Sequence, residues 1–297
     1  MKINWLVESD VFGEDIPRLV DEIKLQGHNC IVLSYEPFTS YKGNYSKRSH
    51  YLNAFPDYEP TIFYGSINFA QQVARESKWI PGVFYNKDAY KCSHFYPFLG
   101  KYHLAQEYAF LPWGSILEKK NWIFDTFGNN GCVFMRPDCG EKTFTGKVFT
   151  YERFEDEIKT LCYNEPQPNE LVVISEPKNI SKEWRFIVSD NKVVTGSLYK
   201  QDGFTKQKCF DINNHKDSGQ QGSLSWLLHN IIKDYQPDPI YCVDICQTKN
   251  GYYHLLELGA FTSCGLYRCN LREVVIAASE AAYKEWKEYQ CAESSAV

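Results

Sequence analysis

The chain has 297 residues, of which 43% are hydrophobic and 23% charged, and a formal net charge of −5. A chain of this size and composition builds a sizeable globular core, with two or three lobes. The negative charge excludes a general attraction to nucleic acid or to an anionic membrane. No segment approaches the roughly 20 apolar residues that span a bilayer. We therefore expect neither nucleic acid nor membrane as a partner.

The eleven cysteines point to a reducing compartment. Their number is odd, they contain no Cys-x-x-Cys pair, and no histidine lies at a metal-ligand spacing from them. A disulfide framework or a zinc site is therefore not expected, and we predict reduced, mostly buried thiols in a cytoplasmic protein. Residues 1–10 are typical of a strand rather than of a signal peptide.

The first third of the chain predicts a small open α/β domain that ends near residue 98. Apolar patterns alternate between strands and helices, with a polar, tyrosine-rich loop over 36–59. The expected elements are a strand at 2–8, a helix at 14–26, strands at 29–34 and 61–65, and a helix at 66–78.

The remaining two thirds predict hairpins and a few helices. Residues 101–127 favour a mostly helical segment broken by Pro112, and 202–223 favour a polar, mobile loop. Strands are expected at 131–136, 146–150, 171–176, 184–189 and 192–199, and helices at 152–163, 224–235 and 272–289.

A predicted hairpin near the C-terminus carries the strongest chemical signal. Asn250-Gly251 favours a two-residue type I′ turn between two β-prone runs. Counting outward from this turn, Asp244 lies opposite Glu257, among Cys242, Cys246 and Leu255. The other face carries apolar side chains, namely Val243, Ile245, Leu256 and Leu258.

Two carboxylates side by side repel each other unless a cation lies between them, and Mg²⁺ prefers such oxygen ligands. The hairpin therefore predicts Asp244 and Glu257 as metal ligands. The alternative is a solvated face that happens to carry two acids. A three-residue loop or a bulge would change the register.

Residues 133–147 predict a phosphate-binding segment. A strand ends at Arg136, and a turn-rich loop with Gly140, Lys142 and Gly146 follows. Backbone N–H groups in such a loop bind phosphate oxygens, and the two basic side chains add charge. An ordinary surface hairpin is the alternative. The segment lacks the eight-residue P-loop pattern and precedes no helix, which excludes that family.

Residues 171–188 predict a nucleoside-binding segment. A buried strand ends at Glu176-Pro177, and Glu183 and Arg185 share one face of the next strand. A carboxylate accepts hydrogen bonds from two ribose hydroxyls, and an arginine binds a phosphate or carboxylate through two hydrogen bonds. The alternative is a surface ion pair that contributes little.

In this order the motifs resemble those of the ATP-grasp superfamily over most of residues 98–270. Lys101 before a helix, Lys200 further along and the final Asp244…Glu257 pair complete the series. Glu176 and Glu183 are seven residues apart, as are the corresponding glutamates of D-alanine–D-alanine ligases.

The resemblance implies an α+β fold in which two α+β subdomains grip ATP behind a small α/β open-sheet domain. The implied units are an N-terminal domain at 1–98, a first ATP-grasp subdomain with the phosphate-covering loop at 99–170, and a second with the hinge strand and metal site at 171–297. Specificity in such folds depends on loops and on the N-terminal domain.

The resemblance also implies roles for single residues. Lys101, Arg136, Lys142 and Lys200 would hold phosphates. Glu176 and Lys178 would line the adenine pocket, Glu183 would bind the ribose, and Asp244 and Glu257 would bind Mg²⁺. Arg185 and Arg268, with Lys200, are the candidate catalytic residues for a substrate carboxylate and its acyl phosphate.

Two positions depart from the usual pattern. Arg136-Pro137 stands where Lys-Pro is common, which resembles a phage-associated clade and allows a host-cytoplasm location. Gly259 stands where many members have an asparagine metal ligand, so one ligand is missing unless Thr262, Ser263 or water replaces it.

The expected activity is that of an ATP-dependent, ADP-forming ligase that joins a carboxylate to an amine through an acyl phosphate, with ATP and Mg²⁺. Two alternatives are a phosphotransferase of the same fold that acts on a hydroxyl, and a non-catalytic nucleotide-binding protein. The sequence leaves the carboxylate, the amine and the oligomeric state open.

Overall fold

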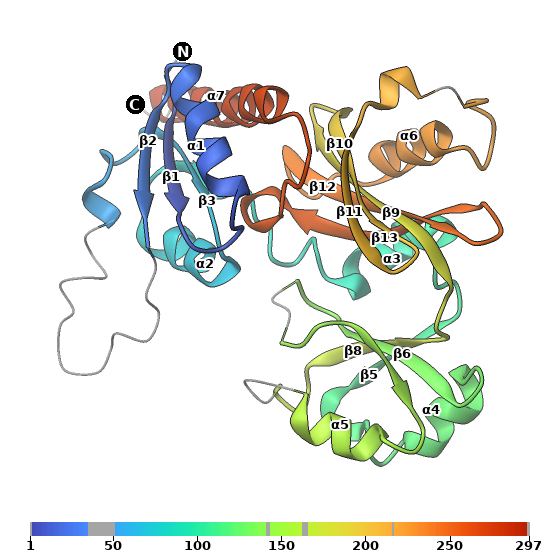
Figure 1. Cartoon of the computed structure of the whole chain (residues 1–297). Coiled ribbons are helices and arrows are strands. Elements are labelled where there is room, and N and C mark those ends of the chain that lie inside the picture. Colours follow the sequence, from blue (N-terminus) through green and yellow to red (C-terminus); the bar gives the residue numbers. More distant parts are fainter. Residues whose placement is uncertain (1, 35–50, 141–142, 162–165, 216, 296–297) are drawn as a thin grey trace.

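The computed structural model describes residues 2–34, 51–140, 143–161, 166–215 and 217–295. Three sheets follow one another along the chain (Figure 1). Most of the predicted 36–59 loop, and Lys142 of the predicted phosphate-binding segment, lie outside the described residues.

The first sheet is parallel, with strand order β2-β1-β3-β4. It is formed by β1 (Asn4–Glu8), β2 (Asn29–Leu33), β3 (Pro60–Tyr64) and β4 (Ile80–Gly82). Helices α1 (Asp15–Leu25) and α2 (Ile67–Glu76) connect these strands. The long C-terminal helix α7 (Leu271–Ser295) packs with this sheet and with α1, so the end of the chain shares the core of its beginning (Figure 1).

The middle sheet is antiparallel, with strand order β5-β8-β6-β7. It contains β5 (Tyr108–Pro112), β6 (Cys132–Pro137), β7 (Lys147–Thr150) and β8 (Leu171–Ser175), and its core includes α4 (Lys120–Phe127) and α5 (Phe154–Thr160). The prediction of a mostly helical 101–127 segment is wrong for β5. Its five residues pair with β8, and this pairing outweighs the local helical preference.

The third sheet has five antiparallel strands in the order β11-β10-β9-β12-β13. They are β9 (Ile180–Ser189), β10 (Lys192–Gln201), β11 (Phe204–Phe210), β12 (Ile240–Thr248) and β13 (Tyr253–Ala260). Helices α3 (Cys92–Leu99) and α6 (Leu224–Asp234) pack on one face. The prediction that all of 202–223 is a loop is wrong, because β11 forms an exposed edge strand beside β10.

The β12–β13 hairpin differs from its prediction at two points. Thr248 N–H donates to Tyr252 O, and Gly251, at φ +88°, closes a three-residue loop where a two-residue turn is predicted. Further along, Ile245 pairs with Leu255 and Asp244 with Glu257, so Leu256 is the extra residue of a bulge.

The two shifts offset each other. Asp244 therefore faces Glu257 as predicted, although the turn does not have the predicted type. The predicted faces of two leucines are wrong: Leu255 is fully buried in the core with Val243 and Ile245, and Leu256 takes no part in that cluster.

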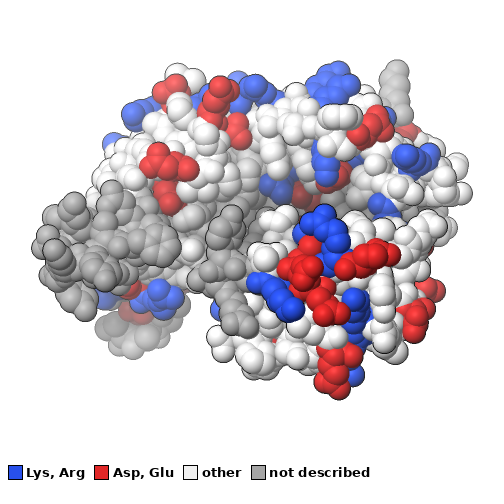
Figure 2. Space-filling model, turned by 60° about the horizontal axis from the view of Figure 1, so that its bottom comes forward, with Lys and Arg blue, Asp and Glu red and all other residues white. Residues whose placement is uncertain are grey.

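Short 3-10 helices complete the elements, at η2 (Tyr51–Asn53), η3 (Gly100–Tyr102), η4 (Trp113–Ser115), η5 (Ile212–Asn214) and η6 (Phe261–Ser263). None of the helices in the described part combines the length and apolar character that a membrane span needs. On the face in Figure 2, acidic and basic side chains of the described residues are interspersed. β8, which the predicted boundary at residue 170 assigns to the third unit, pairs within the middle sheet.

Candidate active site

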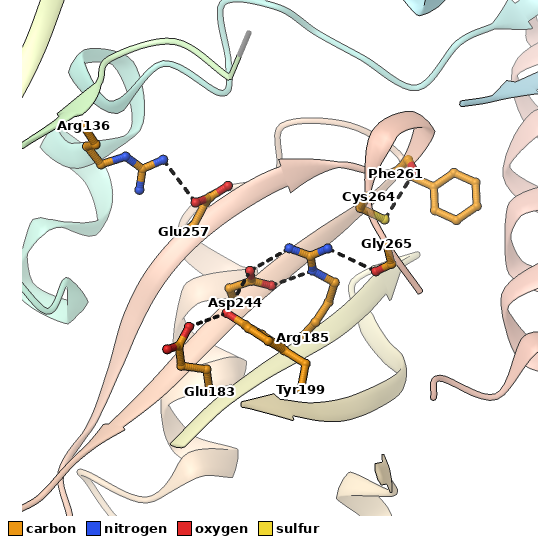
Figure 3. Close-up of polar contacts among 9 residues, drawn as sticks. All are labelled: Arg136, Glu183, Arg185, Tyr199, Asp244, Glu257, Phe261, Cys264 and Gly265. Carbon is orange, nitrogen blue, oxygen red and sulfur yellow. Dashed lines mark hydrogen bonds and ion pairs between the residues drawn. The ribbon is translucent and has the colours of Figure 1, made fainter. Parts of the chain in front are cut away.

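One face of the third sheet carries a row of charged side chains across four neighbouring strands. Figure 3 shows Glu183, Arg185, Asp244 and Glu257 of this row. Lys200 on β10 is opposite Glu183 on β9, Arg185 on β9 is opposite Asp244 on β12, and Asp244 is opposite Glu257 on β13. Because side chains alternate along a strand, the residues between them point to the apolar core under α3 and α6. The row is thus the polar face of a sheet whose other face is buried.

Asp244 and Arg185 form a buried ion pair within this sheet. The guanidinium donates from Nε to Oδ1 and from Nη2 to Oδ2, both at 2.8 Å, and from Nη1 to the Gly265 carbonyl at 3.1 Å. Burial disfavours the charged form of Arg185, but the neighbouring Asp244 carboxylate outweighs this effect and raises the Arg185 pKa well above its ordinary value. Arg185 is therefore held as a fixed cation.

Glu257 joins the third sheet to the middle sheet. Its Oε2 lies 3.2 Å from Nη2 of Arg136, which stands near the end of β6. The two side chains are 26% and 16% exposed, compared with 5% for Asp244 and 11% for Arg185. The predicted phosphate-binding arginine and the predicted metal-binding glutamate thus meet across the gap between the two sheets.

Tyr199 links Glu183 to Asp244. Its hydroxyl donates to Glu183 Oε2 at 2.8 Å and approaches Asp244 Oδ2 at 3.4 Å, while Lys200 Nζ lies 2.9 Å from Glu183 Oε1. The register shifts between Leu198 and Lys200 on both sides of β10. This bulge turns both Tyr199 and Lys200 toward the charged row, where a regular strand would point only one of them.

The tyrosines at this site are not recognisable in the sequence. Tyr199 stacks on Tyr267 with ring centroids 4.9 Å apart, and Arg185 lies 5.2 Å from the Tyr267 ring. Tyr267 has φ +51°, which is unusual for a bulky residue, and its N–H donates to Asp15 Oδ2 at 3.0 Å. Neither a bulge nor a residue in the left-handed conformation produces a periodic pattern in a sequence, so the sequence predicts neither tyrosine. Its only indication of this place is the candidate Arg185 on the neighbouring strand β9.

Glu176 lies just after β8, at the connection between the middle and third sheets. Lys178 Nζ donates to its Oε2 at 2.5 Å, and Asn129 Nδ2 donates to its Oε1. The hydrogen bond from Lys178, followed by that from Asn129, lowers the Glu176 pKa below its ordinary value. The predicted adenine-side residues thus form one charged cluster at the hinge.

A cavity of about 510 Å³ adjoins the charged row. Glu257 and Arg185 line it from the third sheet, and Asp15 and Ser66 line it from the N-terminal region. Its other described lining residues include Phe12, Tyr85, Tyr90, Cys242, Gly259, Ser263, Cys264 and Tyr267. This volume falls in the usual range for small-molecule sites.

Among the predicted site residues that the structure describes, only Arg185 and Glu257 line this cavity, and Lys101 and Arg268 lie apart from the charged row as well. Lys101 is 64% exposed, and its Nζ is 3.0 Å from Asp234 Oδ2 at the end of α6. Arg268 is exposed and lines a separate surface pocket with Arg18 and Asp21. The structure therefore brings together Arg136, Glu183, Arg185, Lys200, Asp244 and Glu257, but neither Lys101 nor Arg268.

The donor set suits a hard divalent cation. Asp244 and Glu257 face each other on adjacent strands, and Glu257 lines the cavity. Mg²⁺ is commonly held by one or two carboxylates together with phosphate oxygens. In the described part of the chain, no group of three or more His, Cys, Asp or Glu side chains is arranged as a complete metal site.

Comparison with known proteins identifies the family. The model of the ATP-grasp domain, R2K clade family 2, matches residues 118–277, which is more than half of the chain. The chain therefore belongs to the ATP-grasp family, and the predicted superfamily and its α+β fold are confirmed. No curated protein matches the sequence.

Solved structures share the fold at low sequence identity. The D-cycloserine synthetase DcsG is 12% identical at a TM-score of 0.62, with 95% of this chain and 100% of that chain covered. N5-carboxyaminoimidazole synthetase from Staphylococcus aureus with ADP is 11% identical at a TM-score of 0.58, with 94% of this chain and 78% of that chain covered. D-alanine–D-alanine ligase from Bacillus anthracis is 9% identical at a TM-score of 0.55, with 97% of this chain and 99% of that chain covered.

Proposed function

We propose that this protein is an ATP-dependent ligase that joins a carboxylate to an amine and releases ADP and phosphate. The observation that carries the proposal is the 510 Å³ cavity, which connects Glu257 and Arg185 of the charged row with Asp15 and Ser66 of the N-terminal region. A site that only hydrolysed ATP would need no space for a second substrate. The similar ligase structures agree with this choice of activity.

In this proposal ATP is a substrate that lies between the middle and third sheets. Arg136 and Lys200 contact its phosphates from opposite sides, Glu183 accepts hydrogen bonds from the ribose, and the chain at Glu176–Lys178 contacts the base. Lys142 belongs to the same phosphate-binding segment, outside the described residues. We leave Lys101 out because it is paired with Asp234 on a different surface.

The proposed reaction has two steps. An oxygen of the substrate carboxylate attacks the γ-phosphorus, the bond from that phosphorus to the β-phosphate oxygen breaks, and ADP leaves. The amine nitrogen then attacks the acyl carbon, the carbon–oxygen bond to phosphate breaks, and a proton leaves the nitrogen as the amide forms.

The protein's contribution to these steps is electrostatic. Arg185 and Arg136 present guanidinium N–H groups where negative charge gathers on the transferred phosphoryl group. When bound between Asp244 and Glu257, Mg²⁺ would neutralise phosphate charge. The cavity lined by Glu257 has room for the second substrate beside the transferred phosphoryl group.

One observation favours a second candidate, a non-catalytic nucleotide-binding protein. Both predicted metal ligands are ion-paired with arginines, Asp244 with Arg185 and Glu257 with Arg136. If Arg136 stays on Glu257 with ATP bound, the metal would lose Glu257 as a ligand and turnover would stop.

A coupled measurement of ADP and free phosphate with mixed carboxylates and amines tests the proposal. A ligase forms both products in equal amounts, and their rate rises when an amine is added. ADP without free phosphate would indicate a phosphotransferase acting on a hydroxyl, and neither product at saturating ATP would favour the non-catalytic protein. Glu257→Gln, prepared in parallel, controls for contaminating ATPases.

A further inference from the structure

The cross-strand pair that neighbours Asp244 and Glu257 provides no side-chain oxygen ligand. One step along the hairpin on the same face, the cross-strand pair is Cys242 and Gly259. Neither residue offers an oxygen side chain, although both line the cavity. The acid pair is therefore the only oxygen-bearing side-chain pair on these two neighbouring cross-strand positions.

Gly259 is required by packing rather than by backbone conformation. A Cβ atom at this position would lie 2.6 Å from Cys242 Sγ, closer than non-bonded atoms approach. Gly259 is not among the glycines with positive φ. The thiol of Cys242 thus occupies the space that any side chain at 259 would need.

Of the two hydroxyls on the following turn, that of Ser263 lines the cavity and that of Thr262 is already engaged. Thr262 is fully buried, and its Oγ1 accepts a hydrogen bond from Phe84 N–H at 2.8 Å. This bond ties the turn after β13 to the segment after β4. Moving Thr262 toward Asp244 would break it.

A fixed positive charge already lies against Asp244. Arg185 contacts both carboxylate oxygens at 2.8 Å and donates to Gly265 O. Its guanidinium carbon lies 5.8 and 5.2 Å from the ring centroids of Tyr199 and Tyr267. A second divalent ion bound to Asp244 would meet this charge at close range.

We propose that this site takes one divalent cation per nucleotide, between Asp244 and Glu257, and that the Arg185 guanidinium supplies the second positive charge. The inference rests on the proposed function in assuming that the nucleotide binds here. It goes beyond that function because it gives the number of cations and names the residue pair, Cys242 and Gly259, that excludes a second cation.

Manganese counting by electron paramagnetic resonance tests this directly. Full-length protein in excess over AMP-PNP keeps all nucleotide bound, and the loss of the free Mn²⁺ signal then gives the number of ions bound per nucleotide. The expected result for the natural chain is one, without the exchange broadening that two Mn²⁺ ions about 4 Å apart produce. Two ions with that broadening would overturn the inference and leave the ligase proposal intact.

A paired variant sharpens the test. Cys242→Gly combined with Gly259→Asn removes the thiol and adds an amide oxygen in its place, so we expect a second Mn²⁺ ion. Cys242→Gly alone is the matched control, and it should still take one. A single ion in the double variant, at normal nucleotide affinity, would show that the thiol is not what excludes the second cation. If neither the natural chain nor either variant binds AMP-PNP, the proposed function itself is wrong.

Discussion

The two arginine–carboxylate pairs of the site differ in where their partners come from. Arg185 and Asp244 belong to adjacent strands of one sheet, make two 2.8 Å contacts and are almost fully buried. Arg136 and Glu257 belong to different sheets, make one 3.2 Å contact and are more exposed. The first pair is part of the folded framework, and the second is a contact that a ligand between the sheets can replace.

The largest effect expected from this difference concerns stability. Arg185→Ala leaves Asp244 buried without its counter-ion, which typically costs about 3–5 kcal/mol. Arg136→Ala should cost about 1 kcal/mol, because Glu257 can turn toward solvent. Urea denaturation of both variants measures the contrast.

A double variant separates charge from packing. Arg185→Met combined with Asp244→Leu removes both charges. This double variant should recover most of the stability that Arg185→Ala loses, but it should not recover turnover. Equal destabilisation by Arg185→Ala and Arg136→Ala would mean that the two pairs do not differ in the way their geometry indicates.

The second prediction concerns turnover. Glu257→Gln removes a charged oxygen ligand from the gap between the sheets and should lower ADP formation by at least about 100-fold, which corresponds to about 2.7 kcal/mol. The fold should be unaffected, with a melting temperature within about 3 °C of the natural protein. Asp244→Asn should also abolish turnover, but with a visible loss of stability because Arg185 loses its partner. Near-normal activity in either purified variant would remove that residue from the metal site.

A third carboxylate, that of Asp238, accepts hydrogen bonds from Tyr90 and Asn86 instead of pairing with an arginine. Burial raises its pKa to about 6, offset in part by hydrogen bonds from Tyr90 Oη at 2.7 Å and Asn86 N at 3.1 Å. Between pH 4 and pH 6 the unfolded chain releases this proton before the folded chain does, so the contribution of Asp238 to stability falls as pH rises through that window.

Asp238→Asn should therefore stabilise the protein by about 1–2 kcal/mol at pH 7.5. The gain should disappear as the pH approaches 4, where the natural carboxyl is protonated in both states. Denaturation curves of the two proteins at several pH values make the measurement. A gain that does not depend on pH would have to come from packing rather than from ionisation.

The sequence was sufficient for the features that depend on alternation and chain order. The open α/β character of the first domain followed from the alternation of strand and helix patterns. Asp244 faces Glu257 as predicted, but only because two deviations from the predicted hairpin offset each other. The hairpin turn and the two leucine faces were not predicted correctly, because a bulge at Leu256 offsets the longer loop at Gly251. β5 and β11 were missed for a related reason, since both depend on pairing with a strand distant in sequence or on an exposed edge.

The candidate site divides in the same way. Glu183, Arg185 and Lys200 met where the motif order placed them. Lys101 and Arg268 did not, because each position depends on a turn that periodicity does not describe, one at η3 and one beside the left-handed Tyr267. Tyr199 could not be predicted as a site residue, because the bulge beside it breaks the alternation that assigns side chains to one face of a strand.

Tyr199 also provides the smallest and most specific test of the contrast between the two pairs. Tyr199→Phe keeps the ring stacked on Tyr267 and removes only the hydroxyl that donates to Glu183. We expect a stability loss of about 1 kcal/mol and a several-fold higher KM for ATP, because Glu183 keeps Lys200 but loses the bond that orients it. Lys200→Met is the matched control, since it removes the other partner of the same carboxylate from a more exposed position. If Tyr199→Phe leaves the KM for ATP unchanged while Lys200→Met raises it, the tyrosine serves only the buried Arg185–Asp244 framework, and the ribose site depends on the lysine alone.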